Sequence, residues 1–258
     1  MNNLVFDIET VPDVELGRRI YKLEGLSDAD VAKAMFTLQR QASANDFLPL
    51  EQHRIVAISC ALRSRDGLRV WSLGEPDASE RELLERFYDG IERFSPCLIS
   101  WNGSGFDLPV MHYRALKAEV QAPRYWEVGD EDNTFRYNNY LGRFHWRHID
   151  LMDVLAAYQA RGRASLTDVA GLLGFPGKLG FEGSKVWDAF LAGEIVRIRQ
   201  YCETDVLNTY LIYLRFEMMR GKLSRERHAE EVERVKACLR SGTEPHFAQF
   251  LRAWETAA

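Results

Sequence analysis

The sequence contains few cysteines and no long run of apolar residues. Among its 258 residues the cysteines are scattered without any paired Cys-x-x-Cys spacing; they are Cys60, Cys97, Cys202 and Cys238. This distribution argues against a disulfide framework or a zinc knuckle and is typical of reduced, mostly buried thiols in a cytosolic protein. No apolar run could cross a bilayer, and the first residues lack the basic start and apolar stretch of a secretory signal. We therefore expect a cytoplasmic protein that makes no contact with a membrane.

Positive charge is also in short supply. The 33 Lys and Arg residues are outnumbered by 38 Asp and Glu residues, which leaves a formal net charge of −5. A protein that coats nucleic acid by bulk electrostatics needs the opposite balance. An enzyme acting on an anionic substrate is not excluded, because bound metal ions can neutralise an acidic pocket before the substrate arrives.

The length fits one domain of generous size, or one domain with insertions. Alternating and helical periodicities predict an α/β fold, with a mixed β-sheet flanked by helices. Strands are expected at residues 4–11, 53–62, 68–73, 97–101 and 146–151, and helices at residues 83–94, 107–116, 166–173 and 194–216. Residues 13–50 carry no strand signals and are expected to form a helical insertion after the first strand. Residues 220–258 are expected to form a C-terminal helical extension, and residues 125–143 an irregular loop.

Two acidic residues share one face of the first expected strand. Side chains two residues apart point the same way along a strand, so Asp7 and Glu9 lie together and Leu4, Phe6 and Ile8 lie opposite. Two neighbouring acids repel each other and lose hydration if they are covered. A hard divalent cation bound by both removes that conflict. The alternative is a half-exposed strand with a solvated acidic face.

A further acid, Asp205, lies within an apolar stripe on the expected helix at residues 194–216. The stripe consists of Ile195, Ile198, Cys202, Thr209, Ile212 and Phe216. A carboxylate on a core-facing stripe is costly unless it is paired or bound to a metal. Tyr201 lies one turn earlier on the same face, where its hydroxyl could orient a water beside a metal. A plain hydrogen bond between Tyr201 and Asp205 at a partly exposed helix edge is the alternative.

Asp107 follows a buried strand and a glycine-containing turn, and it opens a helix. It could simply be an acid that stabilises the helix N-terminus, and Pro109 near the helix start agrees with that role. A side chain at a strand-to-helix junction is also well placed to reach a central site, so the two roles are compatible.

Three segments together resemble the exonuclease motifs of the DEDD superfamily. They are Phe6-Asp7-Ile8-Glu9-Thr10, the segment from Asn102 to Phe106-Asp107-Leu108-Pro109, and Tyr201-Cys202-Glu203-Thr204-Asp205. They occur in the right order and span nearly the whole chain. The Tyr-x-x-x-Asp form is that of the DEDDy branch. The chain most resembles the proofreading exonuclease domain of B-family DNA polymerases and their stand-alone bacterial relatives.

The resemblance implies a ribonuclease-H-like fold and a metal-dependent 3′–5′ exonuclease that acts on single-stranded ends, with DNA favoured over RNA. It implies that two Mg²⁺ or Mn²⁺ ions are held by four carboxylates, those of Asp7, Glu9, Asp107 and Asp205. It also implies that Tyr201 positions the attacking water and that Asn102 and Phe106 contact the terminal nucleotides. No length remains for a polymerase domain, so any proofreading would be exercised in trans.

Several other features carry weaker signals. Lys185 lies where B-family exonuclease domains carry a phosphate-facing lysine, although the local spacing does not match cleanly, and it is kept as a candidate substrate contact. Asp150 is expected to cap a helix rather than to bind a metal. The segment 171–178, which ends at Lys178, has the wrong glycine spacing for a phosphate-binding loop, and no strand precedes it. Residues 137–147 mix aromatic, amide and basic groups, which suits a single-strand stacking surface or an ordinary packed loop equally well.

Two other functions compete with a DNA exonuclease. One is an exoribonuclease that trims RNA 3′ ends, since discrimination depends on contacts to the 2′-hydroxyl that a sequence does not locate. The other is a non-catalytic module that keeps the fold and binds nucleic acid. A degenerate relative of that kind should lack one or more of the acids, whereas all four are present.

Overall fold

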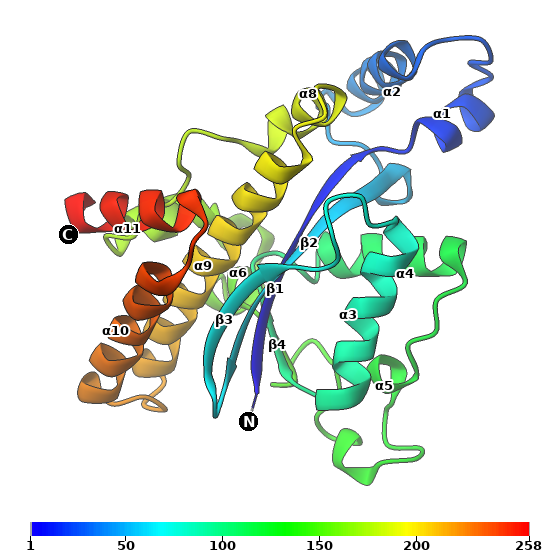
Figure 1. Ribbon diagram of the computed structural model, residues 1–258. Coiled ribbons are helices and arrows are strands. Elements are labelled where there is room, and N and C mark those ends of the chain that lie inside the picture. Colours follow the sequence, from blue (N-terminus) through cyan, green and yellow to red (C-terminus); the bar gives the residue numbers. More distant parts are fainter. Residues whose placement is uncertain (1, 258) are drawn as a thin grey trace.

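The computed structural model describes residues 2–257, and a five-stranded sheet lies at its centre (Figure 1). The strand order is β3-β2-β1-β4-β5. The strands are β1 (Asn3–Pro12), β2 (His53–Ser64), β3 (Gly67–Ser72), β4 (Cys97–Ser100) and β5 (His148–Asp150). Strand β2 runs antiparallel to both of its neighbours, whereas β1, β4 and β5 are parallel. The expected α/β, ribonuclease-H-like mixed sheet is confirmed.

Strand β1 is the central strand, and its two faces belong to different cores. Leu4, Phe6 and Ile8 pack with helices α3 (Glu80–Phe94) and α4 (Asp107–Ala118) on one side of the sheet. Val5 packs on the other side against helix α9 (Ile195–Met219). The predicted alternation along β1 is therefore confirmed, and the face opposite Phe6 is the one that carries the two acids.

Helices cover both faces of the sheet. Helix α9 runs along one face and is covered in turn by α10 (Arg225–Ser241) and α11 (Pro245–Ala257), while α3, α4 and α5 (Pro123–Trp126) lie across the other face (Figure 1). The remaining short helices are α6 (Leu151–Leu155), α7 (Leu166–Leu172) and α8 (Val186–Leu191). Among residues 2–257, no helix is both long and apolar enough to cross a membrane.

The apolar stripe predicted on α9 does face the core, but the burial of this helix extends well beyond the stripe. Every residue from Tyr201 to Leu214 is buried, including polar ones such as Asn208 and Thr209. The cause is the double cover: the sheet packs on one side of α9, and α10, α11 and α7 pack on the others. Asp205 therefore lies on a helix with almost no solvated side, which makes its charge more costly than a stripe edge would.

The segment between β1 and β2 is helical, as expected. It forms α1 (Val14–Tyr21), α2 (Asp28–Ser43) and a short 3₁₀ turn (Leu50–Gln52) that leads into β2. A small core of its own, built on Val31, Met35 and Leu48, holds the two helices together. Figure 1 shows this insertion at the end of the sheet where β1 finishes.

A buried arginine fixes the start of the insertion to the rest of the fold. Arg114 on α4 donates to Asp13 at 2.5 Å and to both carboxylate oxygens of Glu80, at 2.7 and 2.6 Å. Asp13 also caps α1 through the Leu16 amide, and Glu80 also accepts from the Ile55 amide of β2. One guanidinium therefore ties α1, α3, α4 and β2 together.

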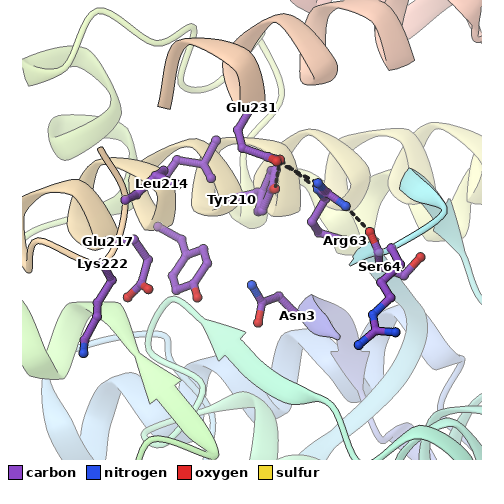
Figure 2. A pocket seen from close by; sticks show the side chains of 11 residues that line it. Asn3, Arg63, Ser64, Tyr210, Leu214, Glu217, Lys222 and Glu231 are labelled. Carbon is purple, nitrogen blue, oxygen red and sulfur yellow. Dashed lines mark hydrogen bonds and ion pairs between the residues drawn. The ribbon is translucent and has the colours of Figure 1, made fainter. Parts of the chain in front are cut away.

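A second ionic anchor lies beside the first residues of β1. Glu231 of α10 accepts from Arg63 of β2 at 2.8 and 2.7 Å and from the Tyr210 hydroxyl of α9 at 3.2 Å (Figure 2). Asn3 lines the pocket around these groups. Because the arginine and the carboxylate are engaged with each other, we interpret this pocket as a structural joint between α10 and the sheet.

Removing the Arg114 guanidinium should destabilise the protein strongly. The Arg114→Met variant leaves the buried Asp13 and the half-buried Glu80 with less compensation, so we expect the free energy of unfolding to fall by about 3 kcal/mol or more. Urea denaturation measures this change. Arg93→Met is the control, because Arg93 and Asp89 form an exposed pair at 4.0 Å, and its loss should cost less than about 0.5 kcal/mol. Equal losses in the two variants would contradict the anchoring role.

Candidate active site

The site begins on β1, where Asp7 and Glu9 project from one face. Asp7 is partly exposed and Glu9 is buried. The pairing of β1 with β2 shifts register between Glu9 and Thr10, so the strand is irregular directly after the second acid. Such irregularities are common beside active sites because they re-aim side chains.

Asp107 joins β1 through a backbone amide that no strand uses. The parallel partner β4 pairs with β1 only from Asn3 to Val5. Farther along this edge, the Ile8 amide donates to the Asp107 carboxylate at 3.1 Å. Asp107 is the first residue of α4 and is buried, so both expected roles hold: it opens the helix, and it lies beside the two strand acids.

Helix α9 brings the third motif to the same place. The Cys202 thiol lies 3.4 Å from both the backbone oxygen and the carboxylate of Asp7, which fixes α9 against β1. One turn on, Asp205 is 8% exposed, and its Oδ1 finds no hydrogen-bond partner among residues 2–257. An unpaired buried carboxylate oxygen is costly in a finished fold and is typical of a site completed by a ligand.

Burial raises the pKa values of all four acids, and repulsion by the other acids of the site adds to this effect at Asp7 and Glu9. The pKa of Asp7 is raised well above its usual range, first by burial and then by the negative charges of Asp107, Glu9 and Asp205. Burial, followed by Asp205 and Asp107, does the same to the pKa of Glu9. Burial raises the pKa of Asp107 to about 7 and that of Asp205 to about 6. Because the charges of Asp107 and Asp205 act on both strand acids, the carboxylates from these three elements lie close to one another.

This donor set fits hard divalent cations. Mg²⁺ and Mn²⁺ prefer carboxylate oxygens, and their charge would relieve the repulsion that raises the pKa values. The Cys202 sulfur also lies within 4.8 Å of ligand atoms of Asp7 and Glu9. Burial and the charge of Asp7 raise the pKa of this thiol, so it keeps its proton and donates to Asp7 rather than acting as a thiolate ligand.

Tyr201 borders the acids from α9. Burial, followed by the charges of Asp205, Glu9 and Asp7, raises the pKa of its hydroxyl above the usual value. The phenol therefore stays protonated and available as a hydrogen-bond donor. Its ring packs against Phe181, with the ring centroids 5.0 Å apart.

Lys178 lies at the site, although no sequence pattern predicted it there. It lines the same cleft as Glu9, and its positive charge lowers the pKa values of Glu9 and Asp205 against the dominant effect of burial. Its position is fixed by Asn208, one turn beyond Asp205, which exchanges hydrogen bonds of 3.1 and 3.0 Å with the backbone of Gly177. The rejected phosphate-loop pattern thus ends in a lysine beside the acids for a reason unrelated to that pattern.

The turn before Asp107 is held in an unusual conformation. Asn102 has φ 64°, in the left-handed region that asparagine tolerates better than most residues. The amides of Asn102 and Ser104 both donate to Asp150 at 2.9 Å, and Asp150 also caps α6, as predicted. Asp150 therefore serves three backbone amides, and it supports the turn that carries Asn102 and Phe106.

The other sequence candidates are placed as follows. Phe106 is half-buried and lines the cleft beside Glu9. Lys185 is exposed at the start of α8; its neighbours Gly183 and Ser184 line that cleft, and its contact with substrate stays a prediction. The 137–147 segment is packed only in part: Tyr140 is buried and Arg147 lies 3.7 Å from the Phe135 ring centroid, whereas Tyr137 and Phe144 are exposed.

Comparison with known proteins identifies the family. Residues 45–254 match a family described as a predicted 3′–5′ exonuclease related to the exonuclease domain of PolB. The chain belongs to this family. The resemblance drawn from the three motifs is thereby confirmed.

Two DNA polymerases are similar to this chain, one in sequence over a short segment and the other in structure. A segment of 39 residues is 51% identical to DNA polymerase 1 of Sulfurisphaera ohwakuensis, and it covers 15% of this chain and 4% of the polymerase. The family B DNA polymerase of Pyrobaculum calidifontis aligns with 93% of this chain and 28% of its own, at 18% identity and a TM-score of 0.45. The chain thus spans only a small part of either polymerase.

The metal-free protein should lose stability as the pH rises. The pKa of Asp205, about 6, exceeds the usual 3.8, so its stabilising contribution is present below about pH 4 and is lost as the pH rises through about 6. In EDTA at about pH 8, Asp205→Asn should therefore be more stable than wild type by roughly 2–3 kcal/mol. Urea denaturation across this pH range measures the effect.

Adding Mg²⁺ should reverse the order of the two proteins at high pH, because only wild type retains all four acids. Asp89→Asn, at an exposed position on α3, is the matched control and should follow wild type throughout. If Asp205→Asn were less stable than wild type in EDTA at about pH 8, burial of the Asp205 charge would not carry the expected cost.

Proposed function

We propose that this chain is a metal-dependent 3′–5′ exonuclease that removes nucleoside monophosphates from single-stranded 3′ ends, with DNA as the favoured substrate. The observation that carries the proposal is the convergence of four carboxylates and Tyr201 beside a cleft that is lined by Glu9, Phe106 and Lys178. The membership of the PolB-related exonuclease family supports the direction of cleavage, and the likeness to DNA polymerases supports DNA.

In this proposal Asp7, Glu9, Asp107 and Asp205 hold two Mg²⁺ or Mn²⁺ ions. When bound, such ions lower the pKa of a water and stabilise the attacking and leaving oxygens at a phosphodiester. The protein's own contribution is to keep the acids fixed before metal arrives. The Ile8 amide holds Asp107, and the Cys202 thiol holds Asp7, so neither carboxylate can turn away to relieve the repulsion.

The remaining residues act on water and substrate. The Tyr201 hydroxyl keeps its proton and orients the attacking water beside Asp205. The Lys178 ammonium, which lines the same cleft as Glu9, neutralises charge on the substrate phosphate, and as a cation it does not compete with the acids for the metals. Asn102 and Phe106 contact the terminal nucleotides from the turn that Asp150 supports.

A 5′-labelled single-stranded oligonucleotide should give a descending ladder with Mg²⁺ or Mn²⁺, and EDTA should abolish it. Asp7→Ala and Asp205→Asn should each lower the rate by at least about a thousandfold. Tyr201→Phe should lower kcat by about a hundredfold with little change in KM, since the hydroxyl acts on the water. Matched RNA should be cut more slowly. Undiminished activity in Asp7→Ala would refute the site, and immediate release of the labelled nucleotide would refute the polarity.

The two candidate lysines can be separated by parallel substitutions. Lys178→Ala should lower kcat/KM by roughly 10- to 100-fold, the effect of losing one charged contact to phosphate. Lys185→Ala should have a smaller effect, because Lys185 is exposed and outside the residues lining the cleft. A larger loss for Lys185→Ala would show that the lysine chosen from sequence is the one that contacts substrate.

A further inference from the structure

The insertion between β1 and β2 forms a wall of the active-site cleft. This cleft of about 700 Å³ contains Glu9 and Lys178, and Trp187 of α8 lines it as well. The insertion contributes Phe36 and Arg40 from α2 and Phe47 from the segment after it. Figure 1 shows α2 and α8 at the same end of the sheet, above the end of β1.

Phe47 is exposed, yet it belongs to an aromatic cluster. Its side chain is 57% exposed. Its ring centroid lies 5.3 Å from that of Phe106 and 5.3 Å from that of His53, and the rings of His53 and Phe106 are 5.1 Å apart. An exposed ring supported by two other rings is a flat apolar surface with one open side. We call Phe47, His53 and Phe106 the aromatic shelf.

Hydrogen bonds of His53 fix the position of the aromatic shelf relative to the acids. His53 is buried, its Nε2 lies 3.1 Å from the Leu48 carbonyl oxygen, and its Nδ1 lies 2.8 Å from the Thr10 hydroxyl. An imidazole that donates from Nε2 to Leu48 can accept from Thr10 at Nδ1. Thr10 directly follows Glu9, so His53 fixes the residue after Phe47 relative to a residue beside the acids.

We propose that the aromatic shelf is a nucleobase-binding site, in which Phe47 stacks on an unpaired base of the strand whose 3′ end lies at the acids. The proposal rests on the function proposed above. An unpaired base suits this place because it presents a flat apolar face to the ring while its phosphate can reach Lys178 in the same cleft. Stacking of this kind tolerates any base sequence. It gives the insertion a role in substrate binding.

The test compares Phe47→Ala with wild type on two single-stranded DNA oligonucleotides. One consists only of thymidine nucleotides, and the other is the same oligonucleotide with abasic sites at its last two 3′ positions. On the first, Phe47→Ala should lower kcat/KM by about 5- to 100-fold, mainly through KM. On the second, wild type and variant should be nearly equal, because no base is present to stack. Phe47→Tyr, which keeps the ring, should behave like wild type.

Phe94→Ala is the matched control, since Phe94 is 60% exposed at the end of α3, outside the residues lining the cleft. It should leave both substrates unaffected. If Phe47→Ala lowered kcat/KM equally on both oligonucleotides, or on neither, the proposed base-binding role of the aromatic shelf would be wrong. Thermal melting of each variant confirms that the fold is intact.

Fluorescence anisotropy with the same oligonucleotides in Ca²⁺ separates this inference from the proposed function. If wild type hydrolyses no substrate but Phe47→Ala binds thymidine DNA at least about fivefold more weakly, the exonuclease proposal fails and the shelf stands. If wild type degrades DNA and Phe47→Ala binds and cuts DNA as well as wild type does, the base-binding proposal is wrong and the exonuclease proposal stands.

Discussion

The electrostatic repulsion among Asp7, Glu9, Asp107 and Asp205 is the constraint on which the rest of the structure depends. Burial raises the pKa values of all four acids, and the charges of Asp107 and Asp205 raise those of Asp7 and Glu9 further, so the folded chain holds the acids together at a cost. The fold tolerates that cost because three elements fix the four acids: β1 holds Asp7 and Glu9, the start of α4 holds Asp107, and the buried middle of α9 holds Asp205. The strain is stored where a cation can release it.

The sheet topology explains why these elements meet. Because β4 pairs with β1 only as far as Val5, the edge of β1 is open at Ile8, and its amide is free to bind Asp107. On the other face of the sheet, α9 crosses β1 closely enough for Cys202 to contact Asp7. A longer β4 would occupy the Ile8 amide and displace Asp107. The short parallel strand is therefore as much a part of the site as the acids are.

Patterns local in sequence predicted much of this arrangement. The two faces of β1, the helical nature of residues 13–50 and the acid at the start of α4 follow from spacing alone. Features that depend on tertiary contacts did not. The stripe on α9 understated the burial of this helix because α10 and α11 cover its outer side. Lys178 was set aside because its place depends on a contact between Gly177 and Asn208, which lie 31 residues apart. The periodicity of apolar residues reports which face of one element is buried, whereas a site forms where several elements come together.

The position of the insertion also follows from the topology. It leaves the sheet at Pro12, three residues after Glu9, and returns at His53, which pairs with Pro12. Any chain inserted between these paired residues must border the acids, and its length can vary without disturbing the pairing of β1 with β2. What makes this insertion a defined wall is its fixation at both ends, by Arg114 on Asp13 and by His53 on Leu48. A surface held at two points beside a reactive centre can select what enters, whereas a loop held at neither would average over many positions.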